Sequence, residues 1–179
     1  MFEVTTEYNT DALLTMIRTA NKTFRKRRYL LRKGFLIVLG LWCIIAGVLL
    51  LPIFRQLSAG ERFIAVAAPV VGALSLAEGL FLNALNVRAS RKTMIEGSNR
   101  WTLRFGEDGV SGENGDGLQN AYPYAKIQAI FETNQYFLLQ IDKLHCIILD
   151  KNGFTQGTCE DFRRFIQEKT GLELRFVIL

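Results

Sequence analysis

This chain of 179 residues has few of the side chains that bind metals or form disulfides. It contains one histidine and three cysteines, Cys43, Cys146 and Cys159. No two cysteines stand at the short spacing of a zinc motif, and a single histidine cannot complete such a site. The sequence therefore predicts no structural zinc, no disulfide framework and no bound cofactor. Reduced thiols, as in a cytoplasmic compartment, are the simplest state of these cysteines.

Charge is absent from one long stretch near the amino end. Residues 34–54 contain no Asp, Glu, Lys, Arg or His. As an α-helix, such a stretch is about 31 Å long, which matches the roughly 30 Å hydrocarbon core of a bilayer. We interpret it as a first transmembrane helix. A cleaved secretory signal fits less well, because the apolar run is too long and its basic cluster does not stand at the terminus.

A second apolar stretch, residues 63–87, follows after a short link. It contains one charged side chain before its end, Glu78, and one proline, Pro69. Its length is enough to cross a bilayer with some tilt. Residues 34–87 therefore predict a membrane hairpin of two transmembrane helices.

Small side chains recur at helical spacing in both stretches. They are Gly40, Cys43 and Gly47 in the first, and Ala68, Gly72, Ser75 and Gly79 in the second. Small residues let helix backbones approach closely, which is the main attraction between helices in lipid. We expect them along the inner seam of the hairpin. The alternative is a homo-oligomer that forms through one of these stripes.

Basic residues flank the predicted hairpin on one side. The six that precede it are Arg25, Lys26, Arg27, Arg28, Arg32 and Lys33. Three more follow the second stretch, whereas the link carries two. Because Lys and Arg favour the cytoplasmic side, we predict a multi-pass protein of the cell membrane with both termini in the cytoplasm. The six residues are also predicted to bind anionic lipid headgroups, which accounts for the net charge of +5 without nucleic acid as a partner.

Residues 1–33 predict a short strand at 2–6 and a basic amphipathic helix that begins near Thr10. An apolar stripe at helical spacing follows it: Leu13, Ile17, Ala20 and Phe24. A basic amphipathic helix is typical of a segment that lies on a membrane surface. The alternative is that the stripe packs on the soluble domain. The helix could also continue without a break into the first transmembrane helix.

From about residue 93 the apolar runs become short and turn residues become regular. We expect six strands, at 101–105, 109–113, 118–122, 126–133, 135–141 and 144–149. A capped helix then begins at Thr158 and ends at Gly171, and residues 172–179 predict a last edge strand. Residues 93–179, with a net charge of −3, therefore predict a small antiparallel β sandwich or open barrel closed by one carboxyl-terminal helix.

Three stretches carry a resemblance to a known family: residues 105–112 (FGEDGVSG), 122–141 (YPYAKIQAIFETNQYFLLQI) and 147–154 (IILDKNGF). Their order of strands, with a short basic turn before a helix, resembles the YcxB-like family of bacterial membrane proteins. The carboxyl-terminal part of that family is similar to bacterial pleckstrin-homology-like (PH-like) domains. The resemblance implies a PH-like domain at an inner membrane. It implies no enzyme activity and transfers no catalytic residue.

Glu78 is the residue most suggestive of a function, because it lies about one turn from the middle of the second apolar stretch. A carboxylate at the bilayer centre costs about 2.5–3.5 kcal/mol on insertion scales, and such residues often mark ion or proton paths. The alternative is a protonated Glu78, or one reached by water, packed in the hairpin or in a dimer seam.

No set of residues in the β region indicates catalysis. His145 is predicted to lie in an apolar strand with no nucleophile clustered near it. The glycines of residues 106–117 lack the helix and the Lys-Ser/Thr step of a nucleotide loop. A phosphoinositide pocket is disfavoured, because four acidic residues accompany Arg100 and Arg104 in the first hairpin: Glu107, Asp108, Glu113 and Asp116.

Two functional hypotheses follow, and neither is an enzyme. The first is a membrane-anchored regulatory or interaction module whose acidic β domain binds an unknown cytoplasmic protein. The second is a small transport subunit, or an assembly subunit of a membrane complex, that uses Glu78 at a helix interface.

Overall fold

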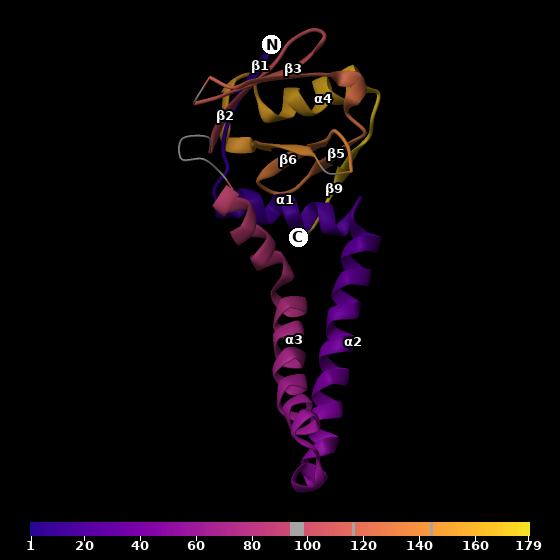
Figure 1. Cartoon of the computed structure of the whole chain (residues 1–179). Coiled ribbons are helices and arrows are strands. Elements are labelled where there is room, and N and C mark those ends of the chain that lie inside the picture. The colour runs from indigo at the N-terminus through magenta and orange to yellow at the C-terminus, as the bar shows by residue number, and fades with distance from the viewer. Residues whose placement is uncertain (94–98, 116, 144) are drawn as a thin grey trace. The chain divides into compact units, whose positions relative to one another are not determined.

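A computed structural model describes residues 1–93, 99–115, 117–143 and 145–179 (Figure 1). The chain divides into two compact units. Residues 1–24 and 87–179 form the first, here called the β unit, and residues 25–86 form the second, here called the helical hairpin. Asp116 and Leu144, expected in the first β hairpin and at the start of a strand, lie outside the described residues.

The described part of the β unit contains two sheets. The first has the strand order β4-β3-β2-β1-β8, from β1 (Phe2–Glu7), β2 (Arg100–Phe105), β3 (Gly109–Asn114), β4 (Gln119–Pro123) and β8 (Phe154–Gln156). The second has the order β7-β6-β5-β9, from β5 (Ala129–Glu132), β6 (Tyr136–Gln140), β7 (Cys146–Asp150) and β9 (Leu174–Phe176). The strands therefore form two sheets and not a closed barrel.

Strand β1 lies inside the first sheet, although it precedes both long helices in the sequence. It pairs antiparallel with β2, from Phe2 opposite Phe105 to Glu7 opposite Arg100, and with β8 on its other side. Its side chains alternate between buried and partly exposed, as expected for a strand with one face on a core. From the sequence, residues 1–33 are predicted to be a separate segment. The structure instead gives residues 1–24 to the β unit, because β1 and the helix after it both pack there.

Helix α4 (Cys159–Thr170) supplies the centre of the main core. Phe162 is fully buried, and its ring lies 4.8–5.6 Å from the rings of four other phenylalanines: Phe2, Phe105, Phe137 and Phe154. Such aromatic pairs add to the burial of apolar area. The Thr158 hydroxyl accepts a hydrogen bond from the Asp161 amide at 3.2 Å, and Gly171 ends the helix with a φ of +66°. Both predicted ends of this helix are confirmed.

Helix α1 (Thr10–Lys22) packs on the second sheet. Its cap is Asn9, one residue before the expected start, which accepts a hydrogen bond from the Ala12 amide at 2.8 Å. Ala12 is fully buried in a cluster with side chains of β5, β6 and β7, and the Phe24 ring stacks on Phe131 at 6.2 Å. Of the two interpretations of this amphipathic helix, the structure supports packing on the folded domain.

The helical hairpin consists of α2 (Lys26–Leu50), a short 3-10 turn (Leu51–Gln56) and α3 (Ala59–Thr93), the last of which continues into the β unit. Residues 23–25 are not helical, so α1 and α2 are two separate helices and not one continuous helix. Two segments, Lys26–Gln56 and Ala59–Ser90, are long and apolar enough to cross a membrane. Only 11% and 17% of their most apolar windows are buried, unlike the core helix of a soluble protein.

The four glycines of the two predicted stripes, Gly40, Gly47, Gly72 and Gly79, lie between α2 and α3, as the spacing predicted. A Cβ atom added to Gly72 would lie 2.6 Å from the Gly40 carbonyl oxygen, and one added to Gly47 would overlap Pro69. A Cβ atom added to Gly79 would come within 3.3 Å of both Leu36 and Ile37. These glycines therefore let the two helices approach closely and set which turns face one another.

Candidate functional site

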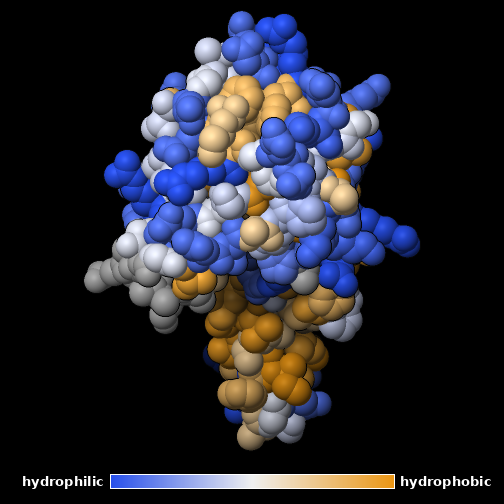
Figure 2. All heavy atoms as spheres, turned by 90° about the horizontal axis from the view of Figure 1, so that it is seen from above, coloured by the Kyte–Doolittle hydropathy of each residue, from blue (hydrophilic) through white to orange (hydrophobic). Residues whose placement is uncertain are grey.

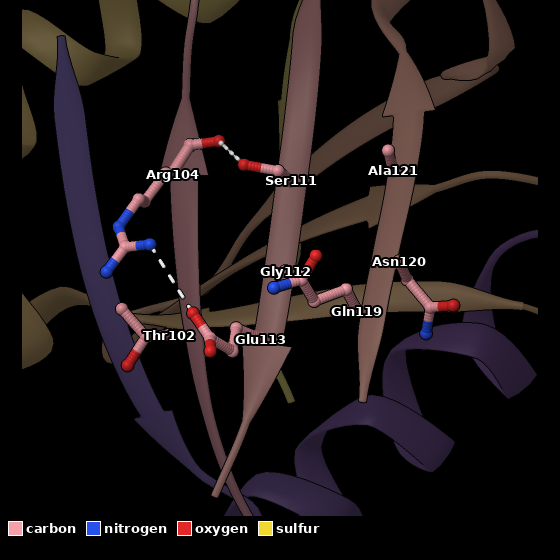
Figure 3. A pocket seen from close by; sticks show the side chains of 8 residues that line it. All are labelled: Thr102, Arg104, Ser111, Gly112, Glu113, Gln119, Asn120 and Ala121. Atoms are coloured by element: carbon pink, nitrogen blue, oxygen red, sulfur yellow. Dashed lines mark hydrogen bonds and ion pairs between the residues drawn. The ribbon is translucent and has the colours of Figure 1, made fainter. Parts of the chain in front are cut away.

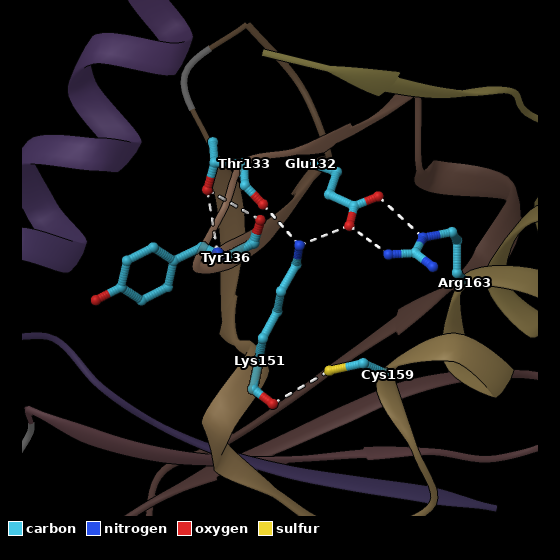
Figure 4. Close-up of polar contacts among 6 residues, drawn as sticks. All are labelled: Glu132, Thr133, Tyr136, Lys151, Cys159 and Arg163. Carbon is cyan, nitrogen blue, oxygen red and sulfur yellow. Dashed lines mark hydrogen bonds and ion pairs between the residues drawn. The ribbon is translucent and has the colours of Figure 1, made fainter. Parts of the chain in front are cut away.

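The most buried charge in the described β unit belongs to Glu132, the last residue of β5 (Figure 4). Lys151 Nζ lies 2.6 Å from Glu132 Oε1 and also donates to the Thr133 carbonyl at 2.7 Å. Arg163, on α4, donates from Nη2 to Oε1 at 2.6 Å and from Nε to Oε2 at 3.0 Å. This two-point pairing fixes α4 against the second sheet.

The pKa of Glu132 reflects two opposing effects. Burial by itself raises the pKa of this carboxyl group, whereas hydrogen bonds from Arg163 and Lys151 lower it, and the net shift is downward. Glu132 is therefore ionised at neutral pH, and its carboxylate accepts three hydrogen bonds from its two partners. Because a general base needs a pKa near the working pH, we assign Glu132 a structural role.

Cys159, the first residue of α4, is the thiol nearest to this network. Its Sγ atom donates to the Lys151 carbonyl at 3.1 Å. Burial raises the pKa of the thiol above its ordinary value, against the lowering effect of Lys151 and Arg163. The thiol form is thus favoured over the nucleophilic thiolate, so the arrangement does not resemble an activated cysteine.

His145 lies just before β7 rather than inside a strand as the sequence predicted. Its imidazole is 73% exposed, and its Nδ1 atom lies 2.8 Å from Asp142 Oδ2 in the same turn. The Asp142 carboxylate also accepts the His145 amide at 2.7 Å. This pairing stabilises a tight turn. Within the described residues, no group of three His, Cys, Asp or Glu side chains could hold a metal ion.

A shallow hollow of about 230 Å³ lies over the outer side of the first sheet (Figure 3). Its lining comes from β2, β3 and β4, namely Thr102, Arg104, Ser111, Gly112, Glu113, Gln119, Asn120 and Ala121. β4 is an edge strand, and most of its side chains are exposed. The hollow is open and most of the residues that line it are polar, which suits a protein surface better than a small apolar ligand.

Arg104 is the cation at the centre of this hollow, and two carboxylates hold it. Its Nε atom lies 2.8 Å from Glu3 Oε2, and its Nη1 atom lies 3.4 Å from Glu113 Oε2. Both carboxylates therefore compete with any phosphate for Arg104. This charge pattern agrees with the sequence argument against a phosphoinositide site at the first hairpin.

Glu78, in the second apolar stretch, forms an ion pair with Arg32, which precedes the first apolar stretch. Arg32 Nη2, on α2, lies 2.6 Å from Glu78 Oε1, on α3. The pair is within the helical hairpin, and its side chains are 58% and 41% exposed. Glu78 therefore lies beside the first apolar turns of α2, near the residues that face Gly79, and away from the middle of the hairpin.

All six basic candidates, Arg32 included, lie at the start of α2. Arg25 immediately precedes α2, and the other five are in its first turns. Four of the six are exposed: Lys26, Arg27, Arg28 and Arg32. Lys33 is half-buried, and its ammonium lies 5.9 Å from the centre of the Tyr29 ring. The structure brings these cations together on one helical segment, which can interact with an anionic surface.

The network around Glu132 was not found by sequence reasoning. Lys151 and Arg163 are 19 and 31 residues away from Glu132, so no local spacing links them. The available signal was weak: Glu132 interrupts the apolar run of its strand. Only the packing of α4 against β5 reveals why a carboxylate is tolerated there.

Comparison with known families gives one match. Residues 105–166, from the end of β2 into α4, match the family described as YcxB-like protein. The match confirms the family resemblance predicted from the sequence, and it covers both sheets except for β1, β9 and most of β2. No curated protein and no solved structure matches the chain.

Proposed function

We propose that this protein is a membrane-anchored interaction module, in which the hairpin crosses the cell membrane and a PH-like β unit binds a protein partner in the cytoplasm. One observation carries the proposal: two long, exposed apolar helices are inserted in the sequence between two strands that pair in one folded unit. An exposed apolar surface of this extent favours contact with lipid, and hydrophobic residues gather in the space-filling view (Figure 2). The β unit, by contrast, buries most of its large apolar side chains in two hydrophobic clusters.

The pairing of β1 with β2 supports a hairpin rather than a single span. β1 precedes both long helices and β2 follows them. Two strands of one sheet cannot lie on opposite sides of a bilayer, so the chain must cross an even number of times. The excess of basic residues outside the connecting turn favours the cytoplasm for this sheet.

The hollow beside β4 is the surface that we assign to the partner. It combines an exposed edge strand, whose backbone can pair with an added segment, with side chains of both charges. We propose binding rather than catalysis because Glu132 is held by two cations and the Cys159 thiol is neutral. The transport alternative loses support for a similar reason, since the Glu78 carboxylate is already paired with Arg32.

Topology can be tested on the full chain in intact cells. In a background with Cys43, Cys146 and Cys159 replaced by alanine, the variants Ser58→Cys and Asn120→Cys are treated with a membrane-impermeant maleimide. We expect labelling at position 58 in intact cells and at position 120 only after permeabilisation. Labelling at position 120 from outside would overturn the proposed orientation.

Partner binding can be tested with a photoreactive amino acid introduced in place of Ala121, in the hollow. Crosslinks to a protein are expected there and are not expected from position 168 on the exposed side of α4. Equal crosslinking from both positions would argue against a specific site at β4. If position 121 gave none in cells that express the partner, the interaction module would be rejected.

A further inference from the structure

We propose that residues 175–179 form a second membrane contact, in which Ile178 and Leu179 enter the headgroup region of the same bilayer. The inference rests on the proposed membrane anchoring and adds a surface of the β unit that touches lipid. It predicts that the β unit is held against the membrane at this segment rather than only tethered by the hairpin.

The segment exposes apolar side chains that the fold does not cover. Ile178 is 78% exposed, Phe176 is 56% exposed and Leu179 is 40% exposed. Single exposed apolar residues are ordinary, but a cluster of large ones in consecutive sequence commonly marks a contact surface. Arg175 stands beside them and is also exposed. A short run with both basic and apolar side chains suits the boundary between headgroups and acyl chains.

The backbone of this segment is held in place, so its exposure is not that of a free end. The Val177 amide donates to the Glu132 carbonyl at 2.8 Å, which extends the pairing of β9 with β5. Lys22 Nζ, at the end of α1, donates to the Ile178 carbonyl at 2.9 Å. The Val177 side chain packs with the cluster between α1 and the second sheet. Ile178 and Leu179 are thus presented from a fixed edge beside α1.

This edge lies near Phe24, the last residue of the β unit before the helical hairpin in the sequence. Phe24 stacks on Phe131, and Phe131 is opposite Arg175 in the pairing of β5 with β9. Phe24 and Val177 belong to the same hydrophobic cluster as Phe131, so the segment lies beside the residue at which the chain leaves the β unit.

The charges around the segment are those that an anionic membrane attracts. Arg18 and Lys22 are exposed on α1, and Arg175 is exposed on β9. Arg18 lines the same surface hollow as Ile178 and Leu179, and Lys22 donates to the Ile178 carbonyl, so these cations lie beside the segment. Each Lys or Arg near an anionic surface favours binding, and the apolar side chains add their burial. A lipid surface therefore fits this edge better than an acidic protein does, because lipid would also remove the exposed apolar side chains from water.

The test uses the full chain in vesicles of phosphatidylcholine and phosphatidylglycerol. In the background with the three cysteines replaced by alanine, Ile178→Cys is labelled with a nitrobenzoxadiazole fluorophore, and lipids with a nitroxide near the headgroup are added. We expect a blue-shifted emission and at least a twofold greater quenching than at the control site. Leu118→Cys is the matched control, because Leu118 is equally apolar and 58% exposed but lies at the β3–β4 turn.

The outcomes separate this inference from the function on which it rests. If the chain floats with the vesicles after alkaline extraction but labels at 178 and 118 are quenched equally, the second contact is rejected and the anchoring stands. If the chain does not float, both are rejected. Leu179→Cys provides a second labelling site, so that a disturbed Lys22 contact at position 178 cannot decide the result. Greater quenching at both 178 and 179 than at 118 supports the inference.

Discussion

Arg32 and Glu78 form an ion pair between the two long apolar helices, with Nη2 and Oε1 2.6 Å apart. In water, such an exposed pair contributes little, about 0–1 kcal/mol. In a bilayer each charge without its partner is costly, so the two residues depend on one another. The pairing with Arg32 also explains why the Glu78 carboxylate can lie in an apolar helix without a role in proton transfer.

The first prediction concerns this dependence. Glu78→Gln and Arg32→Gln should each destabilise the association of α2 with α3, because each leaves one charge unpaired. The double variant should be less affected than the sum of the two. We expect a coupling energy of about 0.6–1.7 kcal/mol, as for polar contacts between membrane helices. Reversible unfolding in bicelles measures it. Strict additivity would show that the pair is not formed in lipid.

The second prediction concerns the glycine seam. Gly40→Ile should separate α2 from α3, because a Cβ atom at this position would already lie 2.7 Å from a Leu76 side-chain carbon and 2.8 Å from the Gly72 carbonyl oxygen. Overpacking of this kind costs about 1–3 kcal/mol. Gly34→Ile is the matched control on the same helix, since nothing lies within 4 Å of its added Cβ atom. Energy transfer between labels on the two helices measures the separation, and equal effects at 40 and 34 would contradict the seam.

The third prediction follows from the lowered pKa of Glu132. A carboxyl group with a lower pKa in the folded than in the unfolded state stabilises the fold above its unfolded pKa, near 4.5, and this stabilisation is lost as the pH falls through the folded value. The melting temperature of the β unit in the full chain should therefore fall in acid, below about pH 4.5.

Glu132→Gln tests the origin of that loss. It should lower stability at neutral pH by about 1.5–3 kcal/mol, the value of hydrogen bonds to charged groups, and should flatten the dependence on pH in acid. Glu168→Gln, on the exposed side of α4, is the control and should change stability by less than about 0.5 kcal/mol. Thermal unfolding followed by near-ultraviolet circular dichroism gives both values. An unchanged acid slope in Glu132→Gln would assign the dependence to other carboxylates.

The fourth prediction concerns β1. Val4 is fully buried in the main core, so Val4→Ala should destabilise the β unit by about 1–3 kcal/mol. Glu7→Ala, on the same strand, should have little effect because Glu7 is exposed. In the same way, a fragment that begins at residue 93 should not fold, whereas residues 1–24 linked to residues 87–179 should. Folding of the shorter fragment would show that β1 is dispensable.

The sequence predicted the two apolar helices, the position of α4 and most of the strands, because each depends on local periodicity. The helix caps at Thr158 and Gly171 are also local signals, and both were recognised. The six expected strands correspond to β2 to β7, although β5 is shorter than the run at 126–133, since Tyr124–Lys126 form a 3-10 turn. Strand β8, of three residues, was missed because it is too short to alternate.

Relationships between distant residues were the part that sequence reasoning could not reach. Nothing in residues 2–6 indicates that they pair with residues about a hundred positions later. The parallel pairing of β9 with β5 and the contact of Arg163 with Glu132 also join residues far apart in the sequence. Gly153 is an intermediate case. The family resemblance implied a short basic turn within residues 147–154, but the need for glycine comes from the Thr5 carbonyl of β1, which would overlap an added Cβ atom.

The central place of β1 sets an order of events during synthesis. Residues 2–7 leave the ribosome before both long helices, yet the strands on either side of them, 100–105 and 154–156, are made after those helices. Until then β1 has no partner, and closing a loop of such length is slow. If the helices cross a membrane, a chain that inserts only one of them leaves β1 and β2 separated by the bilayer and cannot complete its sheet. Correct insertion would then be a precondition of folding, and misinserted copies would present unpaired strands to cellular proteases.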